Sequence, residues 1–151
     1  MVAVAVAASA ACGAQTPTAA EINAGAQAGL ETVALTIRSA NGAHRFKVEV
    51  ARTPEQQSTG MMFRRSTPPN HGMIFPYAPP QDVAFWMRNT LIPLDMIFIR
   101  ADGTIARIAT AKPLDETAVP SGEPIAAVLE IAGGRSAELG IKEGDKVSWR
   151  H

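Results

Sequence analysis

Two acidic residues lie inside apolar runs of the sequence. Asp95 falls within LDMIFI (residues 94–99), and Glu130 falls within VLEI (residues 128–131). A buried carboxylate is costly unless it is paired, accepts several hydrogen bonds or stays protonated. Two such groups could form an acid/base pair, as in glycoside hydrolysis, if they lay about 5–10 Å apart across a cleft. The alternative is structural: each carboxylate grips backbone N–H groups or an arginine.

Alternation along an extended strand places Asp95 on the same face as Ile97 and Ile99. The polar residues available to pair with the two carboxylates are Arg64, Arg65, Arg88 and Asn89. If the protein is an enzyme, we expect Asp95, Glu130 and Arg88 to be its catalytic residues, acting on polysaccharide or another envelope substrate.

Aromatic and methionine residues concentrate between residues 61 and 98, which hold six of the eight aromatic residues and five of the six methionines. They can form a hydrophobic core, because aromatic rings bury large areas and methionine fills irregular gaps. They can instead line a groove for a sugar, lipid or peptide. The prolines around Tyr77 predict a loop in which this side chain faces solvent. The binding candidates are Trp86, Tyr77, Arg64 and Asn89.

Several other chemistries are excluded or weakly indicated. Three scattered histidines lack metal-ligand spacing, and the single cysteine excludes an intrachain disulfide or a Cys-based zinc site, so no metal is expected. No phosphate-binding loop, dinucleotide fingerprint or Gly-x-Ser-x-Gly turn is present, so no cofactor is expected either. Residues 133–136 (GGRS) could hold an anion on free N–H groups. The net charge of zero excludes a globally basic nucleic-acid binder.

The first thirty residues indicate export. Residues 2–11 (VAVAVAASAA) are too short to span a bilayer but have the size of a signal-peptide core. Ser9-Ala10-Ala11 before Cys12 resembles a lipobox, in which the cysteine becomes lipidated. We therefore expect a signal peptide or lipobox over 1–12 and a flexible linker over 13–30. The protein would be periplasmic or anchored to the membrane as a lipoprotein.

The remaining residues, 31–151, predict one mainly β domain. Alternating residues 32–37 and 46–50 flank a hairpin signal at Asn41-Gly42, and Thr53-Pro54 begins a short helix that ends near Gly60. Five prolines prevent long regular elements over 64–82, where only 72–75 is strand-like. Further strands are expected over 83–87, 94–100, 104–110, 125–131 and 146–149, with a second short helix over 133–140. This pattern is typical of an antiparallel barrel or sandwich.

Several segments carry a family resemblance in chain order. They are GMMFR (60–64), GMIF (72–75), FWMRNTLIPLD (85–95), VLE (128–130) and GIKEGD (140–145). The chain resembles the domain-of-unknown-function 192 family over residues 32–150. The resemblance implies a compact, mostly β single domain that is often exported in bacteria. It implies no reaction and no catalytic residues.

Three functional hypotheses follow. The first is a non-enzymatic envelope domain that binds a small molecule, a glycan or an envelope protein, with a lipid anchor at Cys12 and no nucleic acid. The second is an envelope enzyme that uses the carboxylate pair. In the third hypothesis, the segments that carry the family resemblance have a purely structural role. No heptad or long amphipathic helix indicates an oligomeric state.

Overall fold

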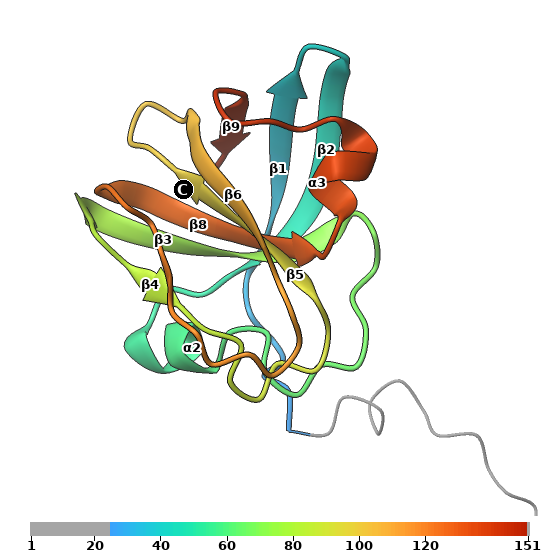
Figure 1. The fold of residues 1–151 in the computed structure, drawn as a ribbon, viewed down its shortest axis with the longest axis vertical. Helices are drawn as coiled ribbons and strands as arrows, with labels where there is room; N and C mark the ends of the chain where they lie inside the picture. The colour runs from blue at the N-terminus through green and yellow to red at the C-terminus, as the bar shows by residue number, and fades with distance from the viewer. Residues whose placement is uncertain (1–24, 151) are drawn as a thin grey trace, which may run out of the picture.

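The computed structural model describes residues 25–150, so the expected signal peptide or lipobox, Cys12 and most of the expected linker lie outside the described residues. Within residues 25–150, nine strands and two short helices follow one another (Figure 1). Their bounds are β1 (Thr32–Ser39), β2 (Gly42–Val50), α2 (Pro54–Thr59), β3 (His71–Gln81), β4 (Ala84–Phe85), β5 (Leu94–Ile99), β6 (Ile105–Ala111), β7 (Val119–Pro120), β8 (Ile125–Ala132), α3 (Arg135–Leu139) and β9 (Lys146–Trp149).

Seven strands form one curled sheet in the order β6-β5-β8-β3-β2-β1-β9, and β4 pairs with β7 in a separate two-stranded sheet. The mainly β single domain with two short helices is confirmed. The strands pair antiparallel except for β2 and β3, which run parallel. The long connection between them, which holds α2 and several prolines, allows this parallel return. The two end strands, β6 and β9, do not pair as neighbours in the sheet, and an isolated bridge joins Thr104 to Lys146 beside them. The sheet therefore does not close into a barrel.

Local sequence signals explain the ends of several elements. The expected first hairpin is confirmed, with Ala40 and Asn41 in its turn between the paired residues Ser39 and Gly42. Thr53 begins α2 with a full capping box, and Gly60 ends it at a positive φ of 48°.

The prolines shorten β3 less than the sequence suggests. The strand runs to Gln81, and its pairing with β8 is interrupted between Pro76 and Gln81. Pro79 and Pro80 fall in this irregular stretch, where no ladder hydrogen bond needs their missing N–H groups. Tyr77 therefore lies in a strand and is half-buried, contrary to the expected solvent-facing loop.

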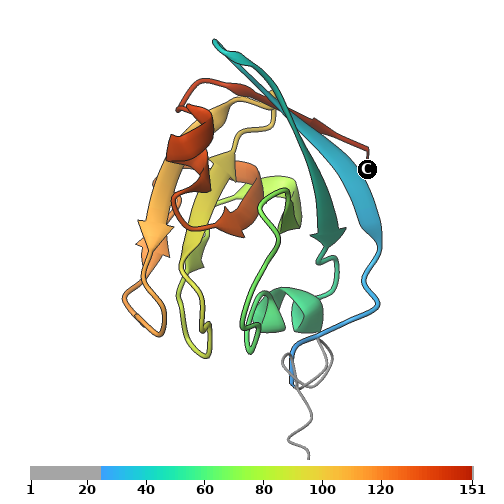
Figure 2. The ribbon, with the colours of Figure 1, turned by 90° about the vertical axis from the view of Figure 1, so that its right-hand side faces the viewer.

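The curled sheet carries a hydrophobic core on each face. Its concave side is filled mainly by aliphatic residues, together with Phe46. Figure 2 shows the two walls of the curled sheet, with the β1–β2 hairpin on one side and β5 and β6 on the other. The outer side of β3, β8 and β5 carries the second core, which is covered by α2 and the segment after it, β4, and the loops after β4. Its buried methionines and phenylalanines are Met61, Met73, Met87, Met96, Phe75 and Phe98.

Candidate functional site

Asp95 lies at the start of β5 on the concave face and is 1% exposed. One carboxylate oxygen accepts hydrogen bonds from the Gly134 N–H at 2.9 Å and the Thr110 hydroxyl at 2.7 Å. The other oxygen accepts from the Ser136 N–H at 2.8 Å. Both oxygens are thus satisfied within the fold, and the structural hypothesis describes this residue well.

The loop that Asp95 holds leads into α3. The Gly133 N–H donates at 2.9 Å to the carbonyl of Pro93, which lies two residues before Asp95 in the chain. A Cβ on Gly133 would lie 2.7 Å from the Pro93 side chain, so this close approach requires glycine. Residues 133–136 could have held an external anion, but the Gly134 and Ser136 N–H groups donate to the Asp95 carboxylate. Residues 93–95, at the end of the family segment 85–95, therefore link β5 to α3 through hydrogen bonds.

Glu130 lies on the opposite face of the sheet. In the register of β5 and β8, Met96 pairs with Glu130 and Asp95 pairs with Ile131. Side chains alternate between the faces of a strand, so Glu130 projects into the outer core while Asp95 projects into the concave one. The carboxylate-pair hypothesis is corrected here: the two groups are separated by the sheet and cannot act across a common cleft.

The Glu130 side chain borders a cavity of about 40 Å³ between the end of α2 and β4. Glu130 is 4% exposed, and its carboxylate takes part in no hydrogen bond within residues 25–150. The cavity exceeds the roughly 10–15 Å³ needed for one water molecule, so a small functional group fits. Its walls are formed mainly by apolar and helix-end residues, namely Gln57, Ser58, Thr59, Gly60, Met61, Met62, Phe75, Phe85, Trp86 and Thr90.

Burial raises the pKa of Glu130 to about 8. The positive charge of Arg64 opposes this rise, and no ion pair joins the two side chains in the described part of the chain. Burial likewise raises the pKa of Tyr77 to about 12, with a smaller contribution from Glu130. The outer core therefore contains a carboxyl group that gains a proton easily and has no local partner, as functional sites often do.

Arg64 is committed elsewhere. One terminal nitrogen forms an ion pair with Glu49 of β2, and the other donates to the Gln27 carbonyl at 3.2 Å. The Gln27 amide in turn donates to the carbonyls of Gln56 and Gly60, at 2.9 and 2.8 Å. Residues 25–30, expected to be part of the linker, therefore pack on the domain beside α2. Arg64 is not positioned to neutralise Glu130 directly.

Trp86 stands at the mouth of the cavity and is 47% exposed. The Arg88 guanidinium lies 5.4 Å from the centre of its ring and 3.6 Å from a Glu116 carboxylate oxygen. Arg88 is exposed and does not approach Asp95, whose contacts are all given above, so a shared site of these two residues is not formed. Asn89 is also exposed, and its amide lies 3.9 Å from the Met62 sulfur.

The loops around this mouth have unusual backbone geometry that sequence reasoning missed. Phe63, Asn89 and Leu114 have positive φ values of 64°, 53° and 61°. Backbone hydrogen bonds join the three loops that carry these residues. The Phe63 N–H donates to the Asn89 carbonyl, and the Leu114 N–H donates to the Thr90 carbonyl. Exposed hydrophobic residues gather on the same loops, namely Phe63, Trp86, Leu91 and Leu114. Such strain in residues other than glycine clusters at functional sites, and no sequence motif would have revealed it.

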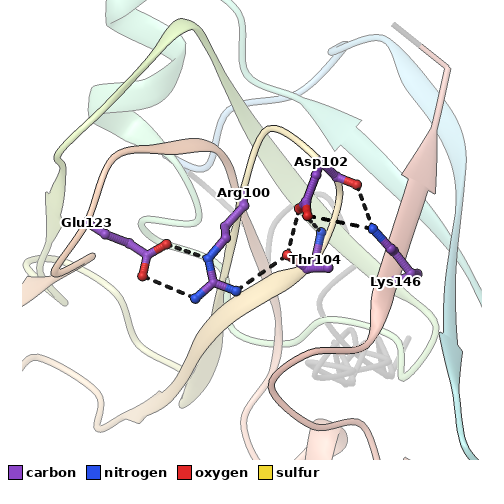
Figure 3. Close-up of polar contacts among 5 residues, drawn as sticks. All are labelled: Arg100, Asp102, Thr104, Glu123 and Lys146. Carbon is purple, nitrogen blue, oxygen red and sulfur yellow. Dashed lines mark hydrogen bonds and ion pairs between the residues drawn. The ribbon is translucent and has the colours of Figure 1, made fainter.

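A second polar cluster holds the turn between β5 and β6 (Figure 3). Thr104 donates from its N–H and its hydroxyl to Asp102, and Arg100 forms an ion pair with Glu123. Lys146 of β9 lies 3.8 Å from Asp102. The charged side chains are paired with one another and largely exposed. We therefore assign this cluster to turn stability and to the contact between the sheet's two end strands.

A larger hollow of about 840 Å³ lies between residues 25–29 and the loop before β3. Its half-buried arginine, Arg64, already pairs with Glu49. Among the described residues no cluster of histidine, cysteine and acidic side chains suits a metal ion. No helix in that same range is long and apolar enough to cross a membrane.

Comparisons with known proteins agree with one another. A family model described as "DUF192: Uncharacterized ACR" matches residues 35–149. A solved protein of unknown function from Novosphingobium aromaticivorans is 48% identical, with a TM-score of 0.78, and the match covers 89% of this chain and 99% of that one. A Sinorhizobium meliloti protein, provisionally designated a transcription regulator, is 38% identical with the same TM-score; the match covers 82% of this chain and 97% of that one. No curated protein matches the chain.

Proposed function

The chain belongs to the DUF192 family, for which no reaction is established, and we propose that it is a non-enzymatic ligand-binding domain of the cell envelope. The ligand occupies the cavity at Glu130 and contacts Trp86 at its mouth. The observation that carries this proposal is a carboxyl group that is 4% exposed, has no hydrogen bond in the described residues and borders a cavity.

The contrast with Asp95 supports a ligand role for Glu130. Asp95 receives three hydrogen bonds from the fold, whereas Glu130 receives none within residues 25–150. An unpartnered buried carboxyl group lowers stability, and a residue that stabilises nothing in the free protein is best explained by a partner that arrives later.

The surrounding loops also favour binding. Trp86 offers an exposed ring beside the cavity, and the strained residues Phe63, Asn89 and Leu114 fix the loops that flank it. A rigid mouth reduces the entropy that binding would otherwise cost. Of the four binding candidates from the sequence, Trp86 lines the cavity and Asn89 lies on a flanking loop. The charge of Arg64 lowers the pKa of Glu130, and the charge of Glu130 raises the pKa of Tyr77.

Enzymatic hydrolysis by a carboxylate pair receives no such support, since Asp95 and Glu130 face opposite sides of the sheet. We also do not extend the regulator designation of the Sinorhizobium relative to this chain. Basic and acidic residues are equal in number, 14 of each, whereas DNA binding depends on a basic surface.

The envelope location rests on the N-terminal sequence, whose apolar stretch and Cys12 support export and lipidation. Fractionation of cells that produce the full chain tests it. We expect the protein in the membrane fraction and the Cys12→Ser variant in the soluble periplasm. Recovery of both proteins from the cytosol would contradict the envelope location.

Ligand binding is tested with ¹⁵N-labelled full-length protein and mixtures of sugars, amino acids, amines and carboxylic acids. We expect shifts that cluster on Gly60, Met61, Trp86 and Thr90, and their loss in the Trp86→Ala variant. A Trp149→Ala variant, whose tryptophan lies on β9 away from the cavity, serves as the matched control. Shifts confined to the hollow beside Arg64, or to the cluster around Arg100, would contradict the proposed site.

A further inference from the structure

Several hydrogen-bond donors that line the cavity at Glu130 already have acceptors within the fold. The Gln57 side-chain amide donates to the carbonyls of Ala51 and Pro76, both at 3.1 Å, and the Thr90 hydroxyl donates to the Arg88 carbonyl at 3.1 Å. The backbone N–H groups of Gly60, Met62 and Thr90 are likewise committed, to the carbonyls of Gln56, Thr59 and Met87 respectively. None of these donors is available to the Glu130 carboxylate, so a ligand group that brings its own N–H groups would supply the hydrogen bonds this carboxylate lacks.

The acceptors favour a positive charge. The Glu130 carboxylate is joined by the rings of Phe75, Phe85 and Trp86, whose electron-rich faces attract cations, and by the polarizable sulfurs of Met61 and Met62. Phe75 and Phe85 already meet edge to face, with ring centres 5.1 Å apart. The nearby cations do not fill the role, because Arg64 pairs with Glu49 and Arg88 pairs with Glu116.

We infer that this cavity binds a primary ammonium group, carried on a short stem that passes Trp86, and this inference rests on the proposed ligand-binding function. The volume of about 40 Å³ suits an ammonium with one or two carbon atoms. A quaternary ammonium is larger and has no N–H to donate to the carboxylate. A neutral alcohol offers one donor and no charge.

Proton release accompanies this binding. Glu130 holds its proton at pH 7 because its pKa is about 8, and an arriving ammonium favours the ionised carboxylate. Arg64, on the segment after α2, and Tyr77, on β3, are the other ionisable groups that interact with Glu130 electrostatically. The pKa of Tyr77 is about 12 and that of Glu130 about 8, so the proton released near pH 7 comes from Glu130.

The test compares n-butylammonium, 1-butanol and butyrate with the full-length protein at pH 7. A Trp149→Phe background leaves Trp86 as the sole tryptophan, so its fluorescence reports occupancy of the cavity. Calorimetry in phosphate and in Tris, which differ in ionisation heat, measures the protons released. We expect n-butylammonium to bind at least tenfold more tightly than 1-butanol and to release nearly one proton, with butyrate weakest.

The Glu130→Gln variant is expected to lose at least tenfold in affinity for n-butylammonium and to release no proton, while 1-butanol binding changes less than twofold. Glu143→Gln makes the same substitution in an exposed turn that does not line the cavity, and this variant is expected to bind like the parent. Equal binding of alcohol and amine at Trp86 would overturn the ammonium assignment and leave the ligand cavity in place. Full amine binding by Glu130→Gln, or no amine binding at Trp86, would also overturn the ammonium assignment. Whether the cavity binds any ligand is decided separately, by the NMR screen described above.

Discussion

Asp95 and Glu130 belong to hydrogen-bonded neighbouring strands, yet they face opposite sides of the sheet because their register is offset by one residue. Both side chains are buried, but their surroundings differ. Asp95 is enclosed by two backbone N–H groups and a hydroxyl, whereas Glu130 borders a cavity without a hydrogen bond in the described range. One carboxylate thus organises the fold, and the other is available for a ligand.

Replacing Asp95 by asparagine tests the structural half of this division. Asparagine offers one acceptor oxygen and turns an NH₂ group toward a backbone N–H, so a buried donor loses its partner. Such a loss costs about 1–3 kcal/mol, which corresponds to a fall in Tm of roughly 3–10 °C for a domain of this size. Thermal unfolding followed by circular dichroism measures it. Thr110→Val, which removes only the hydroxyl donor, is expected to lower Tm less; an unchanged Tm for Asp95→Asn would contradict the assignment.

Gly72→Ala probes the close pairing of β3 and β8 beside Glu130. A Cβ at this position would lie 2.2 Å from the Glu130 carbonyl oxygen and 2.9 Å from an Ile131 methyl carbon. The strands must separate to admit it, so we expect a loss of more than about 3 kcal/mol in the free energy of unfolding. Gly122→Ala is a milder control: its Cβ would meet no atom within 4 Å, and the only cost is the positive φ of Gly122. Equal urea midpoints for the two variants would show that β3 and β8 leave room for a Cβ at position 72.

Arg64→Gln tests the electrostatic link to Glu130. The guanidinium lowers the pKa of this carboxyl group, so its removal is expected to raise the pKa above its present value of about 8. Carbon-13 NMR of glutamate-labelled protein measures the titration directly. Arg52→Gln, which removes an exposed arginine paired with Glu31, should leave the Glu130 titration unchanged. An unchanged pKa of Glu130 in the Arg64 variant would mean that the Arg64 charge does not reach Glu130.

The mouth of the cavity offers a test of backbone strain. Leu114 is 59% exposed and has a φ of 61°, which costs a side chain with a Cβ about 1–2 kcal/mol. Leu114→Gly is therefore expected to leave Tm unchanged or slightly higher, although glycine usually destabilises. Leu91→Gly, an equally sized change at another exposed leucine of these loops, should lower it. A clear drop in Tm for Leu114→Gly would indicate that this side chain supports the fold.

Periodicity and turn chemistry predict much of this molecule. The alternation of Ile97 and Ile99 correctly assigned the face and the burial of Asp95, and Thr53 and Gly60 marked the ends of α2. The partners of Asp95 could not be predicted, because Gly134 and Ser136 are some forty residues away and meet it only through the order of the strands. The one-residue offset that separates Asp95 from Glu130 is a property of the sheet register, which single-strand patterns do not contain.

The candidate site was harder to read for the same reason. Glu130 stood out as an acid in an apolar run, but its cavity depends on the packing of α2 and β4 over the outer face. Tyr77 was misplaced because the local effect of its flanking prolines suggested a loop, whereas pairing with β8 on either side keeps the strand extended. The strained loops at Phe63 and Leu114 had no sequence signal at all.

The central claim is that Glu130 remains unpartnered in the free protein, and the pH dependence of stability for the parent and Glu130→Gln tests it most directly. The unfolded chain releases this proton near the ordinary pKa of 4.5, while the folded chain holds it to about pH 8. The folded state therefore binds more protons between these values, and the parent loses stability as the pH rises through them.

Other carboxylates titrate in both proteins, so the difference between their urea-unfolding free energies isolates Glu130. We expect the two proteins to have similar stability at pH 5, and the variant to be more stable by several kcal/mol at pH 8.5. A variant that is less stable than the parent at both pH values would contradict the claim, because it would show that the Glu130 carboxylate already has a stabilising partner within the fold.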